Sequence, residues 1–446
     1  MEKKSIFSRW TPAQILISTF ALLIICGGFL LSLPIASKVE PLDYLDALFT
    51  ATSAVCVTGL VVVDTVTQFT PFGQVVIIIL IQLGGLGLMT MATMMAILLG
   101  KRISFRSRLI MQEALNQFSL EGMVRLVKAV GTVTMLFEGA GAILLAFRFV
   151  PDYGWSRGIW YGIFHSISAF CNAGFDLLGD FRNLQPYATD WVVNLVIMAL
   201  IISGGIGFSV IAEIWNKRSS KESRTLSLHT RLVLLMTSLL IVVGTLFILI
   251  VEWNKVLSGF SLPHKVLVAL FQAVSPRTAG FSTVPLDMLH TATALMIVIL
   301  MFIGASPGST GGGVKTTTFG ALIALVVASV RGHDEVRLFG RRIPDDIVKR
   351  SVAIIVIGFT LVLSVTMIIS LSDGLPFLPV LFEATSAFGT VGLSMGITTL
   401  LSPIAKMALI LTMFAGRVGP LSLALALALD RVNARISYPE ERIIVG

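Results

Sequence analysis

Long apolar runs separated by short polar segments cover almost the whole chain, and they set the expected architecture. A helix that spans a bilayer needs about 20 predominantly apolar residues. Eight segments meet this length, at 13–34, 73–99, 124–150, 190–215, 230–252, 288–330, 350–372 and 402–429. The sequence therefore predicts an all-α polytopic membrane protein with eight transmembrane helices, of which the sixth is interrupted.

Each odd-numbered span is separated from the next even-numbered span by a shorter stretch that suits a half-helix, because about a dozen residues cannot cross a bilayer. These four stretches are alike: LFTATSAVCVTGL from residue 48, IFHSISAFCNAGF from 163, LFQAVSPRTAGF from 270 and LFEATSAFGTVGL from 381. Aligned on their phenylalanines, they place serines in one column and glycines in another, namely Ser53, Ser168, Ser275 and Ser386, and Gly59, Gly174, Gly280 and Gly392. The third stretch is one residue shorter than the others. We therefore expect four helix–pore loop–helix repeats around one pseudo-fourfold pore.

A single glycine at the same place in four repeats indicates a role for the backbone. Carbonyl oxygens replace the hydration shell of an ion only when they point at the pore axis, and turning them inward often needs a positive φ, which glycine adopts easily. The C-terminal ends of four half-helices would add partial negative charge at the axis. The expected filter, with potassium bound at its four glycines, consists of Thr58, Gly59, Ala173, Gly174, Ala279, Gly280, Val391 and Gly392. These positions lack carboxylates, which favours K+ over Ca2+ and leaves Na+ open.

The interruption of the sixth span lies in residues 304–313, where Pro307 and five glycines cannot continue a helix. Non-helical backbone at membrane depth is tolerated only where it is buried or lines a water-filled path. The segment is therefore either a passive kink or a flexible gate beneath the filter. The other even-numbered spans carry related glycine motifs at similar depth, which serve either close packing or function: GGLG at 84–87, GGIG at 204–207 and GRVG at 416–419.

Two basic residues favour the gate. Lys315 borders the segment, and Arg417 lies inside the eighth span, where an arginine without partners costs about 3 kcal/mol. We expect Arg417 to face the pore and to bond carbonyls or hydroxyls of the segment. The candidate gate residues are Gly304, Ser306, Gly308, Ser309, Thr310, Gly311, Gly312, Gly313, Lys315 and Arg417. Arg277, close to the third glycine, would bridge either half-helix ends or outer-loop acids.

Charge sets the expected orientation and excludes several classes of protein. The chain is 55% hydrophobic and 13% charged, far from a soluble domain. Most lysines and arginines flank the ends of the even-numbered spans, so the net charge of +8 reflects cytoplasmic loops and not nucleic-acid binding, and both termini are expected in the cytoplasm. The outer loops are acidic, either for solvation or as a funnel for cations. Three cysteines are too few for a disulfide framework or a zinc site.

The repeats and the basic segments divide the chain into six expected units. Repeat 1 covers 1–100, a basic amphipathic linker covers 101–122, and repeat 2 covers 123–218. Repeat 3 covers 219–330, repeat 4 covers 331–430, and a cytoplasmic tail covers 431–446. The linker suits either an interfacial helix or a surface on which a partner docks.

The chain as a whole resembles the Trk/Ktr/HKT superfamily of K+ transporters, and most closely the membrane subunit of bacterial Ktr systems. The resemblance rests on the four repeats, on the loops VTGL at 57–60, NAGF at 172–175, TAGF at 278–281 and TVGL at 390–393, on the break at 304–313 and on Arg417. It implies a homodimeric K+ uptake protein of the bacterial plasma membrane with one pore per protomer and no organic cofactor. It also implies a cytoplasmic ring of nucleotide-binding RCK domains that senses ATP and ADP, a gating role for the broken span, and in some relatives activation by Na+.

Two other classes of protein compete with a channel-like pore. A Na+- or H+-coupled symporter also has broken helices, but its repeats are commonly inverted or paired halves. An intramembrane enzyme needs a nucleophile with a base, or a metal cluster. His165 and Glu383 occupy matching columns of two repeats, but no triad or ligand set accompanies them. Downhill flux without a coupling ion would separate the pore from the symporter.

Overall fold

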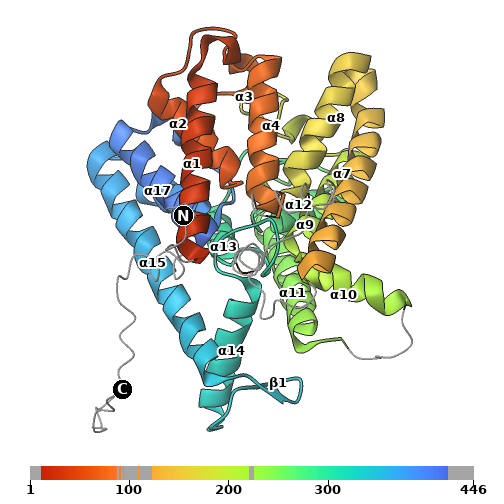
Figure 1. Cartoon of the computed structure of the whole chain (residues 1–446), viewed down its shortest axis with the longest axis vertical. Coiled ribbons are helices and arrows are strands. Elements are labelled where there is room, and N and C mark those ends of the chain that lie inside the picture. Colours follow the sequence, from red (N-terminus) through yellow and green to blue (C-terminus); the bar gives the residue numbers. More distant parts are fainter. Residues whose placement is uncertain are drawn as a thin grey trace, which may run out of the picture.

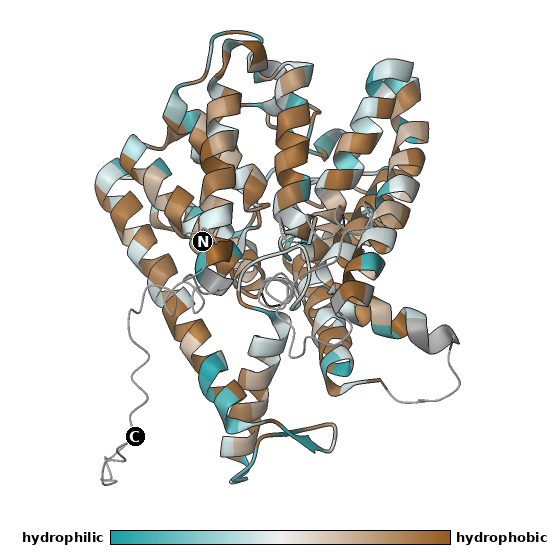
Figure 2. Ribbon diagram, viewed as in Figure 1, coloured by the Kyte–Doolittle hydropathy of each residue, from teal (hydrophilic) through white to brown (hydrophobic). Residues whose placement is uncertain are grey.

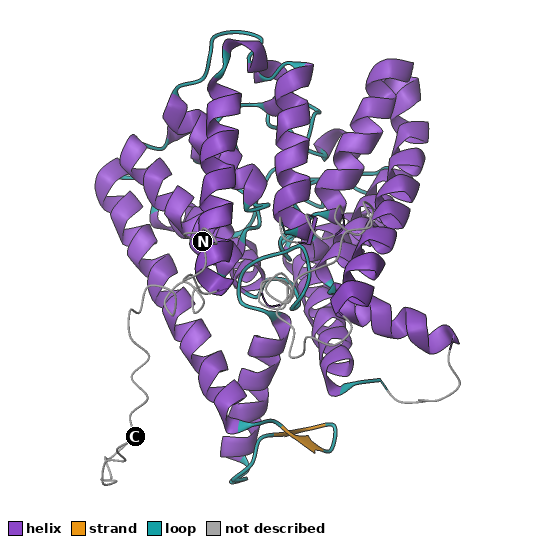
Figure 3. Ribbon diagram, viewed as in Figure 1, coloured by secondary structure: helices purple, strands orange, loops and turns teal. Residues whose placement is uncertain are grey.

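The computed structural model describes residues 12–87, 123–219 and 226–419, together with positions 90, 91, 94 and 109. Over these ranges the chain is mostly helical (Figure 3), and the only strands described form a hairpin of β1 (Arg337–Leu338) and β2 (Arg341–Arg342). The predicted all-α class is confirmed. The tail at 431–446 and, apart from residue 109, the linker at 101–122 lie outside the described residues.

Four long helices are each long and apolar enough to cross a bilayer, and they make the protein a multi-pass membrane protein. They are α1 (Pro12–Ser32), α7 (Met123–Tyr153), α11 (Leu228–Val251) and α15 (Asp345–Asp373). α1 begins on Pro12, and proline suits the first turn of a helix because its missing N–H would be unpaired there. Apolar residues cover most of the outward faces of the helices in Figure 2, as a lipid environment requires.

Each long helix is followed by one of the short helices predicted as half-helices: α2 (Tyr44–Val55), α8 (Trp155–Phe170), α12 (Leu262–Val274) and α16 (Phe377–Gly389). The Asp43 carboxylate caps α2 by accepting a hydrogen bond from the backbone N–H of Leu45. Smaller elements lie in the connections: η2 (Pro34–Ala36), α3 (Thr65–Gln68), η3 (Gln185–Tyr187) and η4 (Thr398–Leu400). Every half-helix ends immediately before the loop that carries a repeat glycine.

The even-numbered spans each start with a helix that ends at or near a glycine. They begin as α4 (Pro71–Leu86), α9 (Trp191–Gly205), α13 (Thr291–Phe302) and α17 (Pro403–Val418), and α13 is followed after a break by α14 (Thr316–Val330). The fourth span, predicted as one apolar segment over 190–215, is bent, because α9 turns by 96° into α10 (Phe208–Ser219). The reason is the glycine motif: Gly207 has a φ of 99°, and Gly87 and Gly419, which end α4 and α17, have φ values of 79° and 95°.

The packing of the helices closes into a ring. Each even-numbered helix packs against the half-helix of the following repeat, α4 on α8, α9 on α12 and α13 on α16, and α17 packs back on α2. The last of these contacts includes an ion pair, with Lys406 Nζ 2.6 Å from Asp46 Oδ1. The four loops that follow the half-helices therefore meet at the centre of the ring.

Candidate functional site

The four repeat glycines lie against one another and form a closed circle, which we call the glycine ring (Gly59, Gly174, Gly280 and Gly392). A Cβ atom built on Gly59 would lie 3.0 Å from the Cα of Gly174, and one on Gly174 would lie 2.9 Å from the Cα of Gly280. The corresponding distances are 3.3 Å from Gly280 to Gly392 and 2.8 Å from Gly392 to Gly59. Chain order is thus also spatial order, and no larger residue fits in the ring.

The carbonyl oxygens next to the ring lie against the glycines of the neighbouring loops. The positions that a Cβ would occupy on the ring glycines are taken by backbone oxygens of the adjacent loop, one from each of Thr58, Ala173, Ala279 and Val391. These are the residues that the sequence paired with the glycines as a filter. The structure therefore brings all eight predicted filter residues together, with backbone oxygens and no side-chain carboxylate at the centre.

The residues two positions before the ring glycines also have an unusual backbone conformation, and they form a second column of equivalent positions. Val57, Asn172, Thr278 and Thr390 have φ values of 58°, 60°, 73° and 51°. The ring glycines have φ values between 71° and 91°, so the left-handed conformation alternates along each loop. Sequence reasoning missed this column, because residues other than glycine rarely adopt positive φ and three of these four belong to β-branched types that resist it. Only Asn172 could have indicated this conformation, because asparagine adopts a positive φ more often than most other residues.

The serine column fixes each loop to its half-helix. In repeats 1 and 4 the hydroxyls of Ser53 and Ser386 each accept a hydrogen bond of 3.0 Å from the backbone N–H of the ring glycine. In repeats 2 and 3 the serine turns the other way and donates, Ser168 to the carbonyl of Phe175 at 2.7 Å and Ser275 to the carbonyl of Phe281. All four serines are buried. The sequence revealed this column but not its function as an anchor.

The third repeat compensates for its missing residue with a shorter hydrogen-bonded turn between its serine and its filter residues. The serine carbonyl accepts from the backbone N–H five residues later in repeats 1, 2 and 4, but from Ala279, four residues later, in repeat 3. Thr278 and Gly280 then have the same left-handed φ values as their counterparts. The third loop thus keeps the conformation of the ring despite its shorter sequence.

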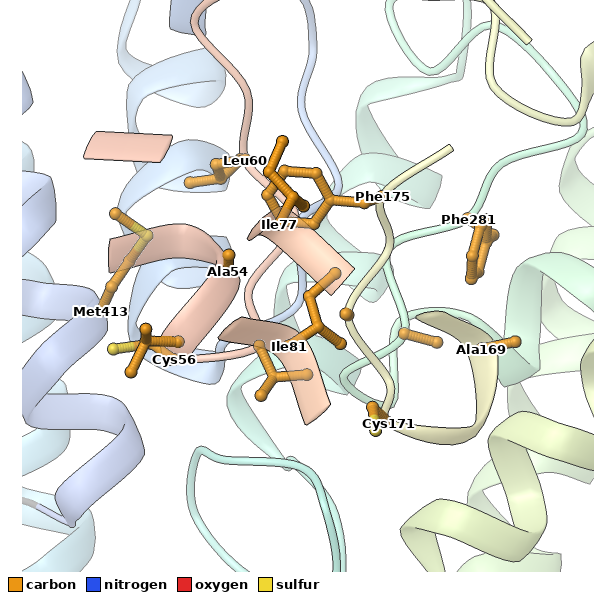
Figure 4. Packing of buried hydrophobic residues seen from close by; sticks show 14 of the residues in the cluster. Ala54, Cys56, Leu60, Ile77, Ile81, Ala169, Cys171, Phe175, Phe281 and Met413 are labelled. Carbon is orange, nitrogen blue, oxygen red and sulfur yellow. The ribbon is translucent and has the colours of Figure 1, made fainter. Parts of the chain in front are cut away.

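A buried apolar layer supports the ring. Leu60, Phe175, Phe281 and Leu393, which follow the four glycines, are at most 1% exposed. Figure 4 shows the first three among the side chains of this core, with Cys56 and Cys171 at the ends of α2 and α8. Tight packing of this kind holds the backbone of the loops in place, because close-packed interiors deform little.

Asp176 follows this layer in the second loop. Its carboxylate accepts a hydrogen bond of 3.0 Å from the backbone N–H of Leu178. Burial of the side chain raises the pKa of Asp176 to about 7, and the nearby Asp64 carboxylate raises it further. The group therefore changes charge near neutral pH.

The glycine-rich segment (residues 304–313) is a loop closed at its neck. Ile303 and Val314 pair as a parallel bridge, and the backbone N–H of Thr316 donates to the carbonyl of Ala305 at 3.2 Å. The segment connects α13 to α14, and Gly308 and Gly313 have positive φ. A continuous sixth span is thus replaced by a folded-back loop.

This loop contacts two of the four ring loops and the end of the half-helix α8. The hydroxyl of Thr310 donates to the carbonyl of Phe170 at 3.2 Å, and the backbone N–H of Gly312 donates to the hydroxyl of Thr390 at 3.0 Å. Gly311 lies so close to Thr278 that a Cβ there would overlap its side chain. Backbone N–H groups of the loop also donate to carbonyls at the end of α9, Ser306 to Gly205 and Thr310 to Gly204. A segment with partners in repeats 2, 3 and 4 lies across the base of the ring.

Arg417 ties the loop to the first repeat. Its guanidinium donates to the carbonyl of Thr310 and to the carbonyls of Gly84 and Gly85 in α4, the last at 2.9 Å. Lys315 donates to the carbonyl of Gly311 at 2.7 Å. The expected contact with the loop is therefore present through Thr310.

Of the two kinds of partner expected for Arg417, carbonyls and hydroxyls, the described contacts are with carbonyls. The hydroxyl of Ser306 pairs with Thr316, and that of Ser309 donates to the carbonyl of Ser306. Arg277, for which two kinds of partner were open, donates to the hydroxyl of Thr237 in α11 at 3.2 Å.

The glycine motifs of the other even-numbered helices serve close packing. Cβ atoms on Gly84, Gly204 and Gly416 would overlap carbonyl oxygens at the ends of half-helices, those of Val55, Phe170 and Phe388 respectively. The first glycine of each motif therefore lets an even-numbered helix approach the end of the half-helix in its own repeat.

Comparison with known proteins identifies the family. The family model described as "TrkH: Cation transport protein" matches residues 4–435 of this chain. The chain belongs to the TrkH family. The solved structure of the potassium transporter TrkH from Vibrio parahaemolyticus superposes with a TM-score of 0.74 at 19% identity, over 96% of this chain and 87% of that one, which shows a common fold.

Two relatives are more similar to this chain in sequence than the solved TrkH structure is. The "Ktr system potassium uptake protein B" of Bacillus subtilis is 43% identical over 98% of this chain and 97% of its own length. The "Potassium/sodium uptake protein NtpJ" of Enterococcus hirae is 38% identical over 100% of this chain and 99% of its own length. The resemblance to the Trk, Ktr and HKT transporters is thus confirmed.

Proposed function

We propose that this protein is the K+-translocating membrane subunit of a potassium uptake system of the Ktr type, in the plasma membrane of a bacterium. Its four repeats would cross the membrane in eight passes around one pore, with both termini in the cytoplasm. The glycine ring would act as a K+ filter through which the ion moves as in a channel. No enzymatic reaction is part of this function.

The observation that carries the proposal is the closed ring of backbone oxygens. Four carbonyls, those of Thr58, Ala173, Ala279 and Val391, lie beside four glycines in cyclic order. Rings of carbonyls replace the hydration shell of a monovalent cation, whereas divalent cations are generally held by carboxylates. The names of the relatives, potassium uptake and potassium/sodium uptake, agree with a monovalent cation.

The glycine-rich segment and Arg417 would form the gate. The loop lies across the ring, and the guanidinium charge beside it would repel a cation on the axis. The hydrogen bonds that hold the loop come from repeats 2, 3 and 4, so a movement of the even-numbered helices would release it.

Control of this gate would come from outside the chain. The word "system" in the names of the Ktr relatives implies a further subunit. We infer a homodimer of this chain on a cytoplasmic RCK-type ring that binds ATP or ADP, with Na+ as an activator. The basic hairpin of β1 and β2 and the helix α14 that precedes it extend from the side at which the gate lies (Figure 1), where such a ring would dock.

Ion flux into proteoliposomes tests the function. The purified protein should take up ⁸⁶Rb⁺ down its gradient, and external K+ should compete much better than Na+. Flux that stops without a Na+ or H+ gradient would instead favour the symporter. Absence of any K+-selective flux, with the ring subunit present, would refute the proposal.

A further inference from the structure

The column directly after the aligned phenylalanines holds four different polar residues, Thr50, His165, Gln272 and Glu383, all at most 1% exposed. They lie on the half-helices behind the glycine ring, one in each repeat. Burial of polar groups is unfavourable unless they are hydrogen-bonded. The partners of these side chains therefore indicate what the column does.

In three repeats the partner lies on the segment that leaves the proposed filter toward the outside. His165 Nε2 accepts from the backbone N–H of Leu177 at 3.3 Å, and Gln272 Nε2 donates to the hydroxyl of Ser282 at 2.9 Å. Glu383 accepts from the hydroxyl of Thr398, whose oxygen lies 3.0 Å from the hydroxyl oxygen of Ser394. Ser282 and Ser394 lie two residues beyond their ring glycines. Thr50 is too short to reach such a segment and donates to the carbonyl of Asp46 in its own helix.

In repeats 1, 2 and 3 the side chain in this column carries no charge. Threonine and glutamine carry no charge. His165 Nδ1 lies 2.8 Å from the carbonyl of Tyr161, which can only accept, so Nδ1 carries the proton and Nε2, as an acceptor, does not. His165 is thus a neutral imidazole. The equivalent position in repeat 4 is the one that contains a carboxyl group.

The surroundings of Glu383 contain no counter-ion among the described residues. Its Oε2 atom is buried and has no hydrogen-bond partner there. The basic residues on α17, which packs against α16, bond elsewhere: Lys406 to Asp46, and Arg417 to Thr310, Gly84 and Gly85. On α15, Asp373 accepts from Ser402. An ionised carboxylate in such a place is costly, whereas a neutral carboxyl group is not.

We propose that Glu383, in its uncharged form, is a positioning residue for K+ selectivity, which holds the outer end of the fourth filter loop through Thr398 and Ser394. The inference rests on the proposed function. Selectivity depends on where the ring carbonyls lie, and the fourth loop is held at two points: by Ser386 at Gly392 and by Glu383 beyond it. Release of the outer point lets the carbonyl of Val391 move relative to the other three.

A substitution series separates this role from packing alone. Glu383→Gln keeps the acceptor for Thr398 and the volume without a charge, and it matches Gln272 of the third repeat. We expect it to retain the preference for K+ over Na+. Glu383→Ala removes the acceptor and should lower that preference about three- to tenfold, the effect of about one lost hydrogen bond. Thr398→Val should lower it in the same way, without a change at Glu383, and the double variant should be no worse than the single ones.

The readout is the ratio of K+ to Na+ competition against ⁸⁶Rb⁺ uptake, measured on variants that elute as the native protein in size-exclusion chromatography. Thr366→Val is the matched control, because Thr366 is buried and its hydroxyl bonds only its own helix α15. Two results would overturn the inference and leave the proposed function intact, provided that the wild-type protein prefers K+. One is unchanged selectivity in both Glu383→Ala and Thr398→Val. The other is loss of selectivity in Glu383→Gln. A wild-type protein without preference for K+ would overturn the proposed function as well.

Discussion

Replacement of Arg417 by alanine tests the proposed gate, and the structure predicts its effect. The substitution removes hydrogen bonds to the carbonyls of Thr310, Gly84 and Gly85. Only the bond to Thr310 acts on the glycine-rich segment, since the other two anchor the guanidinium to α4. We therefore expect Arg417→Ala to loosen the loop and to raise K+ flux.

The magnitude follows from that one bond. A hydrogen bond to a charged group contributes about 1.5–3 kcal/mol. If this energy favours the closed loop, its loss shifts the equilibrium about 10- to 150-fold toward the open loop. Lys315, which bonds Gly311, remains and keeps part of the restraint. Flux should therefore rise by up to this factor, until the open loop dominates.

Arg417→Lys separates the restraint from the charge. Lysine keeps the positive charge, but its single ammonium group cannot reproduce the planar fork that joins α4 to the loop. If the hydrogen bonds hold the gate, ⁸⁶Rb⁺ flux into proteoliposomes rises in both variants. If charge alone forms the barrier, only Arg417→Ala raises flux. Unchanged or reduced flux in both variants, each folded and inserted, would refute the reasoning.

Three further predictions concern the ring and its surroundings. Gly392→Ser places a Cβ 2.8 Å from the Cα of Gly59 at a φ of 91°, so it should abolish discrimination between K+ and Na+ in competition assays; unchanged discrimination would contradict the filter. Ser386→Ala removes the anchor of the Gly392 N–H and should cost about 1 kcal/mol, seen as a lower unfolding temperature in detergent. Ser32→Ala should not lower it, because the hydroxyl of the half-buried Ser32 makes a solvent-exposed bond within its own helix. Because burial raises the pKa of Asp176 to about 7, its stabilising contribution is complete below about pH 4 and is lost as pH rises through 7. Between pH 5 and pH 8 the unfolding temperature of Asp176→Asn should fall less than that of the unaltered protein, and equal falls would contradict the assignment.

The sequence predicted the features that repeat. Four glycines and four serines in register indicated where the loops meet, because a backbone conformation needed in every repeat leaves the same residue in every repeat. The sequence also showed that the third loop is shorter, but not that this loop keeps the conformation of the ring. The compensation is a hydrogen bond from the N–H of Ala279 to the carbonyl of Ser275, which spans one residue fewer than its counterparts.

Features that depend on packing could not be predicted. The left-handed conformation of Val57 and Thr390 opposes their own preference and is imposed by the neighbouring loops. The bend after α9 was missed because the apolar run continues through Gly207, and hydropathy does not report direction. The partners of Arg417 were predicted only in part, because Gly84 and Gly85 lie far away in sequence and offer backbone carbonyls, which leave no mark in the sequence.

Direct observation of the ion at the glycine ring tests the central claim. Crystals or frozen particles prepared in Rb+, a heavier analogue of K+, can be compared with the same protein in Na+, with anomalous scattering to identify Rb+. We predict a Rb+ peak on the axis, within coordination distance of the carbonyls of Thr58, Ala173, Ala279 and Val391, which weakens in Gly392→Ser. A protein that transports Rb+ but shows no Rb+ at the ring, or holds Na+ there equally well, would contradict the account.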